Sequence, residues 1–105
     1  MAIKQTTKAA AMDIQPQPVL VITSNREVYF GYTVDPGGPR MELANARMCI
    51  YWASDIRGVL GLAAIGPNDQ CRIGHKVDRL TVLSVITVAS VTAAAAKKWE
   101  GAPWR

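Results

Sequence analysis

Histidine and cysteine, the side chains that most often hold metal ions or carry nucleophilic chemistry, are scarce in this chain. His75 is the one histidine, and the two cysteines, Cys49 and Cys71, lack the paired spacing of a zinc site or a redox motif. No pair among the eight acidic residues stands out as an acid–base couple. We therefore expect no metal, no cofactor and no catalytic residue.

The sequence motifs of common enzyme classes are also missing. There is no nucleophile elbow, and the glycine-rich run Pro36–Pro39 lacks the lysine and the following helix of a phosphate-binding loop, so it is interpreted as a turn. His75 falls on the apolar side of a predicted strand, where a core or interface position is favoured over a general base. The sequence indicates a non-enzymatic protein.

Basic residues outnumber acidic residues only modestly. The net charge is +4, and most arginines are spread singly along the chain. A protein that binds nucleic acid usually gathers its basic residues on one face or in one run. The charge is therefore compatible with an anionic ligand, whereas nucleic-acid binding is only weakly indicated.

Long hydrophobic runs are lacking as well. The longest uncharged run, residues 80–96, is rich in Ser and Thr and is shorter than the about 20 apolar residues of a membrane span. The lysines of residues 1–11 are followed by no apolar stretch, so a secretory signal is not indicated. We expect a cytosolic protein with reduced thiols and no membrane partner.

What the sequence does contain is enough apolar residues for one small core. Half of the 105 residues are hydrophobic, which predicts a folded chain with room for a single domain. Residues 1–17 show no sustained apolar pattern and are expected to form a flexible N-terminal arm. Residues 18–105 are expected to form a single α+β domain, whose small core would gain stability from a partner subunit.

Alternating apolar residues predict strands. These cover residues 19–23, 27–34, 41–43, 46–52, 71–77 and 80–91. In 46–52 we assign Ala46, Met48, Ile50 and Trp52 to the core and the alternate residues to an open face. Ala44 and Asn45, just before this strand, suggest a bulge or a turn.

Two helices complete the predicted fold. Ser54 or Asp55 would cap a short helix that runs through Leu60–Ile65 and ends at Gly66, and residues 92–99 would form a terminal helix. Because the strand 80–91 is apolar on both sides, both must be covered, one by the terminal helix and the other by a second subunit. We predict an α+β homo-oligomer built on a small antiparallel sheet or open barrel of five to six strands, with one short internal helix and a C-terminal helix.

A possible binding face is predicted around Arg47. Residues 47 and 51 point the same way from a strand, and Tyr29 lies on the non-core side of a nearby strand. If the two strands pair, an arginine lies between aromatic rings, which suits a nucleotide base with its phosphate or a protein interface. An ordinary solvated surface explains these residues about equally well.

Three further basic residues are candidates for this function. Arg72 and Lys76 flank Gly74, which permits a ligand to approach the backbone, although a charged edge strand is the commoner meaning. Arg57 lies in the first turn of the short helix, where an anion can meet free N–H groups. The predicted ligand- or partner-binding residues are Tyr29, Arg47, Tyr51, Arg57, Arg72 and Lys76.

Several short motifs carry a resemblance to a known family. They are Tyr29-Phe30-Gly31, Leu43-Ala44-Asn45-Ala46-Arg47, Ile50-Tyr51-Trp52 and the tail Gly101-Ala102-Pro103-Trp104. Together they resemble a family of small uncharacterised proteins of tailed bacteriophages and prophages, a domain of unknown function, over residues 19–104. The uncharged run 84–90, where the family is usually more acidic, and the loop 35–39 depart from that pattern.

The resemblance implies a setting and no mechanism. It implies a phage accessory protein in the host bacterial cytoplasm that counteracts a host defence pathway, either by blocking a host protein or by sequestering an anionic nucleotide signal as a sponge. Two alternatives remain: a nucleic-acid-binding protein that uses the basic arm, and a virion structural or assembly component, suggested by the doubly apolar strand 80–91.

Overall fold

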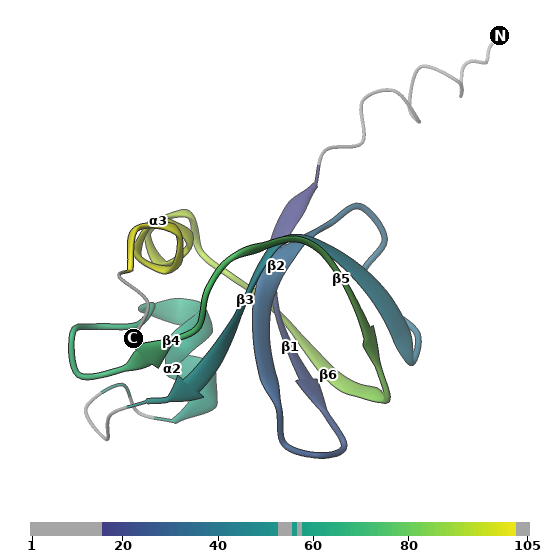
Figure 1. Cartoon of the computed structure of the whole chain (residues 1–105), viewed down its shortest axis with the longest axis horizontal. Coiled ribbons are helices and arrows are strands. Elements are labelled where there is room, and N and C mark those ends of the chain that lie inside the picture. The colour runs from purple at the N-terminus through teal and green to yellow at the C-terminus, as the bar shows by residue number, and fades with distance from the viewer. Residues whose placement is uncertain (1–15, 53–55, 57, 103–105) are drawn as a thin grey trace, which may run out of the picture.

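The computed structural model describes residues 16–52, 56 and 58–102 (Figure 1). Within them the chain forms an antiparallel sheet with one short internal helix and one C-terminal helix, which confirms the predicted α+β class. The elements are β1 (Gln17–Thr23), β2 (Val28–Thr33), β3 (Arg40–Tyr51), α2 (Val59–Ala64), β4 (Arg72–Ile73), β5 (Val77–Leu83), β6 (Val85–Ser90) and α3 (Ala93–Gly101).

The sheet curls into an open barrel. Its strand order is β4-β3-β2-β1-β6, and β5 pairs with β3. Strands β5 and β6 thus lie at opposite ends of the sheet, yet they are separated in the chain only by Ser84, which has a φ of +60°. The N–H of Ser24 donates to the carbonyl of Ser84 at 2.9 Å, and the N–H of Val85 donates to that of Pro39 at 2.9 Å. The bend at Ser84 therefore brings the two ends of the sheet together (Figure 1).

Strand β1 is buried on both of its faces. Val19 and Val21 pack inside the curl with Met41 and Leu43 of β3, whereas Leu20 packs on the opposite side of the sheet against the helices. This second core contains the largest buried side chains, including those of Phe30 and Trp99. The short run VLVIT is therefore the strand that needs cover on both sides.

The prediction that residues 80–91 form one strand covered on both sides is wrong. The bend at Ser84 divides this run into β5 and β6, and the side chains of Leu83 and Ile86 are 62% and 66% exposed. Helix α3 packs over the Phe30 side of the sheet, where the only residues of this run that join its core are Ala89 and Val91. The prediction of a second subunit rested on that strand, so this argument for it no longer holds.

A β-bulge in β3 determines which face each residue of 46–52 occupies, and Ala46 is buried as predicted. Phe30 pairs with Arg47 and Tyr32 pairs with Ala44, so two residues of β3, Asn45 and Ala46, lie opposite one residue of β2. Asn45 adopts a φ of +52°, which asparagine tolerates better than most residues.

The bulge changes which residues of β3 are covered. Beyond it Arg47 and Cys49 are buried on the side of the sheet that the helices cover. Met48 and Ile50 lie on the other side and are exposed, because the core inside the curl does not extend that far. Trp52 packs at the border of the helix-side core. The bulge suggested at Ala44 and Asn45 is confirmed, and the core assignment of Met48 and Ile50 is wrong.

The predicted strand 71–77 is also too long. Only Arg72 and Ile73 pair with β3 as a strand. The last backbone hydrogen bond on this side runs from the N–H of Gly74 to the carbonyl of Met48, at 2.7 Å. His75 is exposed and lies between β4 and β5. It therefore does not occupy the core position that the alternation suggested.

The two helices begin with different caps. The hydroxyl of Thr92 accepts a hydrogen bond from the N–H of Ala95 at 3.1 Å, which makes Thr92 the N-cap of α3. Helix α2 begins at Val59 after Gly58, later than predicted, and the proposed caps Ser54 and Asp55 lie outside the described residues. Neither helix is long enough to span a membrane.

The curl of the sheet requires a glycine at residue 31. A Cβ atom added there would lie 2.7 Å from the Cβ atom of Leu43. We expect Gly31→Ala to lower the free energy of unfolding by about 1–3 kcal/mol, the usual cost of overpacking a core. Gly101→Ala is the matched control because its Cβ would meet nothing within 4 Å. Urea denaturation measures both variants, and equal midpoints would contradict this account of the packing.

Candidate functional site

Arg47 is a structural residue in this fold. Its side chain is 5% exposed, and it donates to the carbonyl of Gly74 through Nε at 2.8 Å. One terminal nitrogen donates to the carbonyls of Trp99 at 2.8 Å and Ala102 at 2.7 Å. Burial lowers the pKa of the guanidinium, which still carries its charge at neutral pH. Arg47 thus binds the C-terminal carbonyls of α3, where a positive charge is favourable, and the prediction that it lies on an open face is wrong.

Tyr29 lies on the other side of the sheet from Arg47. It is half-buried against the core inside the curl. Burial and the neighbouring Glu27 raise the pKa of its hydroxyl. The predicted arrangement of Arg47 between Tyr29 and Tyr51 is therefore absent, because the bulge in β3 places Arg47 opposite Phe30.

The remaining predicted residues are only partly brought together. Tyr51 and Arg72 are both exposed and lie directly opposite each other on β3 and β4. Lys76 is exposed just before β5, and Arg57 lies outside the described residues. Of the six predicted residues, Tyr51 and Arg72 form the one direct cross-strand pair in the described part of the chain.

A more ordered group of side chains lies on the outer surface of β2, β3 and β5. The strand register places Ala44 between Tyr32 and Arg79, and it places Glu42 opposite Thr81. Alternate residues of a strand share a face, so these side chains point away from the core inside the curl. We call this surface the outer face, and it consists of Tyr32, Arg40, Glu42, Ala44, Arg79, Thr81 and Leu83.

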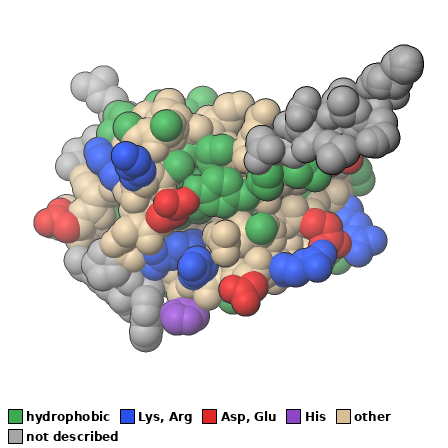
Figure 2. All heavy atoms as spheres, turned by 90° about the horizontal axis from the view of Figure 1, so that it is seen from above, with side chains coloured by type: hydrophobic (Ala, Val, Ile, Leu, Met, Phe, Trp, Pro, Cys, Tyr) green, Lys and Arg blue, Asp and Glu red, His purple; other side chains and the backbone are tan. Residues whose placement is uncertain are grey.

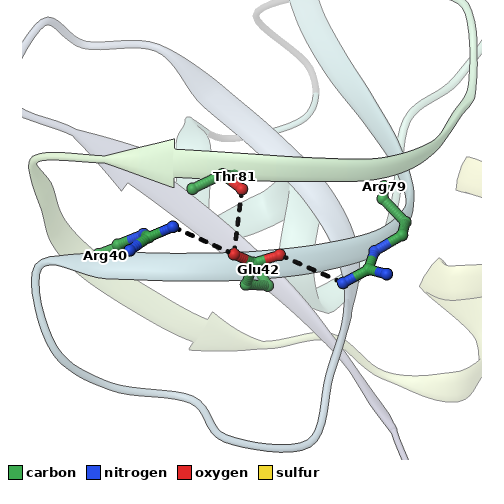
Figure 3. A network of polar contacts seen from close by, with 4 residues as sticks. All are labelled: Arg40, Glu42, Arg79 and Thr81. Atoms are coloured by element: carbon green, nitrogen blue, oxygen red, sulfur yellow. Dashed lines mark hydrogen bonds and ion pairs between the residues drawn. The ribbon is translucent and has the colours of Figure 1, made fainter.

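The charges of the outer face are held in one network (Figure 3). One carboxylate oxygen of Glu42 lies 3.5 Å from Arg40 and accepts a hydrogen bond from the hydroxyl of Thr81 at 3.1 Å. The other lies 3.6 Å from Arg79. All three charged side chains are more than half exposed, so each pair adds at most about 1 kcal/mol to stability. The network places two guanidinium groups on either side of one carboxylate on an accessible surface.

A groove of about 440 Å³ runs along the outer face. Tyr32, Ala44 and Arg79 line it from the sheet, and Asp35 and Gly37 line it from the loop between β2 and β3. The small side chain of Ala44 leaves space between the tyrosine ring and the guanidinium. The groove can therefore accept a side chain from a partner.

Tyr32 is fixed in place at one end of this groove. Its hydroxyl donates to the carboxylate of Glu100 on α3, and its ring meets that of Phe30 edge to face at a centroid distance of 5.4 Å. Burial, together with the hydrogen bond to Glu100, raises the pKa of Tyr32 to about 12. Figure 2 shows hydrophobic side chains across the middle of one face of the molecule, with basic and acidic side chains beside them.

The described residues provide little for metal or thiol chemistry. No group of three His, Cys, Asp or Glu side chains among them is placed to hold a metal ion. Both cysteines are buried and free, and burial raises the pKa of the Cys49 thiol to about 12. A buried thiol of this kind is unreactive while the protein stays folded.

The curled antiparallel sheet and its two helices place this chain among small α+β domains with an exposed sheet surface. The chain belongs to the DUF6948 family, a domain of unknown function, whose family model matches residues 16–99. That match includes all six strands of the described chain and every residue of the outer face. Comparison with curated proteins and with solved structures gave no match. The resemblance to a domain of unknown function is thus confirmed, and a phage origin stays a prediction.

The sequence reasoning missed the outer face, although a signal for it was present. Residues 40, 42 and 44 alternate with the apolar residues Met41 and Leu43, which is the pattern of a half-buried strand. The matching alternation in residues 79–83 was hidden because the whole run 80–91 was interpreted as apolar on both sides.

Proposed function

We propose that this chain is a non-catalytic binding protein that recognises a protein partner through the outer face. The supporting observation is that an Arg–Glu–Arg network, an anchored tyrosine and the exposed Leu83 lie on one surface. Tyrosine and arginine are the residue types that most often dominate the affinity of protein interfaces. Tyr32, whose hydroxyl is held by Glu100, also loses less conformational entropy when the complex forms.

The charges favour a protein over a nucleotide. Glu42 lies between Arg40 and Arg79, so an incoming phosphate would meet a carboxylate beside each guanidinium. Phosphate sites normally offer uncompensated positive charge and several convergent donors. A protein surface can match interleaved charges of both signs. Of the two modes of action expected for this chain, blocking a host protein is therefore supported better than sequestering an anionic nucleotide.

The biological setting rests on the resemblance alone. It supports a phage accessory protein that acts in the host bacterial cytoplasm against a defence pathway. Two other functions stay predictions. Nucleic-acid binding through the basic arm would be tested by measuring whether binding to DNA or RNA depends on salt. A role in the virion would be tested by mass spectrometry of purified particles.

The test of the outer face is charge reversal with a matched control. Arg79→Glu reverses a charge of the groove and Ala44→Trp fills its middle, whereas Lys97→Glu makes the same charge change on an exposed residue of α3. We expect a protein captured from bacterial lysate by the wild-type chain to bind both groove variants at least about tenfold more weakly. Its affinity for Lys97→Glu should be unchanged.

Calorimetry with cyclic nucleotides separates the two modes of action. If the wild type binds a cyclic nucleotide and Arg79→Glu abolishes that binding, the ligand of the outer face is a small anion and not a protein. A partner that binds the wild type and both groove variants equally would disprove the role of the outer face.

A further inference from the structure

Strand β6 has one backbone edge without a partner strand in the described chain. It pairs with β1 alone and ends the strand order of the sheet. The N–H of Val91 donates to the carbonyl of Pro18, and Ala89 lies opposite Leu20. Backbone groups alternate in direction along an antiparallel strand. Those of Thr87 and Ala89 therefore point to β1, and those of Val88 and Ser90 point away from it.

This edge lacks the features that normally keep edge strands apart. Residues 85–90, VITVAS, contain no charge and no proline and are rich in β-branched residues, which is the composition that invites pairing with another strand. The other single-paired strands of the described sheet are different. Strand β4 carries Arg72, and β5 carries Asp78 and Arg79.

From this contrast we infer that β6 pairs with β6 of a second copy of this chain. When two identical strands meet antiparallel across a two-fold axis, the residue at the axis lies opposite its own copy and each other residue lies opposite a residue on the far side of the axis. Because both strands carry the same side chains, a charged strand would bring like charges close together. Strand β6 is the edge of the described sheet that meets this condition. The pairing satisfies the outward N–H and carbonyl groups of Val88 and Ser90, and it lies beside Ile86, which is 66% exposed in one chain.

The pairing leaves the proposed function intact. The outer face belongs to β2, β3 and β5, and β6 contributes no residue to it. A dimer joined through β6 would carry two outer faces and could bind two copies of a partner, or one symmetric partner with increased avidity. The self-association does not depend on whether the outer face binds anything.

Two variants test the edge, one through its side chains and one through its backbone. Ile86→Lys brings one positive charge from each copy into the paired strands, and Ser90→Pro removes an outward N–H without touching the bonds to β1. Leu60→Lys is the matched control because Leu60 is an exposed apolar residue of α2, 64% exposed. Native mass spectrometry and light scattering on the full chain measure the mass, and circular dichroism measures the fold.

We expect the wild type and Leu60→Lys to be dimers and both β6 variants to be folded monomers. Hydrogen exchange at the amides of Val88 and Ser90 should slow as the protein concentration rises. If Ser90→Pro fails to fold, Ile86→Lys and the exchange data still decide the outcome. A monomeric wild type at high concentration would overturn the inference, as would a dimer that persists in Ile86→Lys with both amides exchanging freely.

Discussion

Replacing Trp99 by alanine is expected to lower the free energy of unfolding by about 3–5 kcal/mol. The Trp99 side chain is fully buried and stacks on Phe30 with a ring-centroid distance of 5.1 Å and an interplanar angle of 5°. Its indole N–H donates to the carbonyl of Leu62 at 3.0 Å. The substitution leaves a cavity between α3 and the sheet and an unsatisfied carbonyl on α2. A domain with a total stability of about 5–15 kcal/mol can lose much of its folded population from such a change.

The measurement for Trp99 is chemical denaturation followed by far-ultraviolet circular dichroism. Leu60→Ala serves as the control, since Leu60 is an exposed residue of α2 and surface substitutions usually change stability by about 0.5 kcal/mol or less. If Trp99→Ala cost less than about 1 kcal/mol, α3 would not be docked on the sheet as described here.

Replacing Arg47 by methionine is expected to cost about 3 kcal/mol or more of stability, because several buried carbonyls lose a charged donor at once. Arg47 joins three parts of the fold: β3, the residues after β4 and the end of α3. Methionine keeps most of the side-chain volume and has no N–H group to replace the lost donors. The last turn of α3 should also exchange its amide hydrogens faster, because its carbonyls lose their cap.

Arg79→Met is the control for this second substitution. Arg79 is exposed and has one weak ion pair with Glu42, so its loss should change the stability by less than about 1 kcal/mol. The same urea titration measures both variants. Equal midpoints for Arg47→Met and Arg79→Met would show that the buried hydrogen bonds of Arg47 do not stabilise the fold.

Much of the fold could be predicted because short-range patterns determined it. The β-branched run of β1, the alternation in β2, the loop between Asp35 and Pro39 and the terminal helix each have a local signal, and the structure contains all four. The bend at Ser84 had no such signal, because it depends on a positive φ, which serine rarely adopts. That residue divides the run 80–91 and changes which of its side chains are covered.

The candidate site was harder to predict for the same physical reason. An extra residue in a strand moves every later side chain to the other face. A bulge or turn was predicted at Ala44 and Asn45, and the bulge lies at Asn45 and Ala46. The burial of Arg47 could not be determined without knowing which side of β3 the helices cover. Arg47 was therefore placed on an open surface, when it lies beneath α3. Tyr51 and Arg72 lie opposite each other through the register of β4 against β3, which no local pattern in the sequence indicates.

The pairing of β1 with β6 has a consequence for synthesis of the chain. The residues of β1 are synthesised before those of the other described strands, yet the neighbour on the second edge of β1 consists of residues 85–90. A nascent chain must carry the apolar run VLVIT with that edge uncovered until residues 85–90 have left the ribosome. Contacts between such distant segments close slowly, and partly folded chains with bare strand edges aggregate readily. Overproduction at low temperature, or together with a chaperone, should therefore raise the yield of soluble protein.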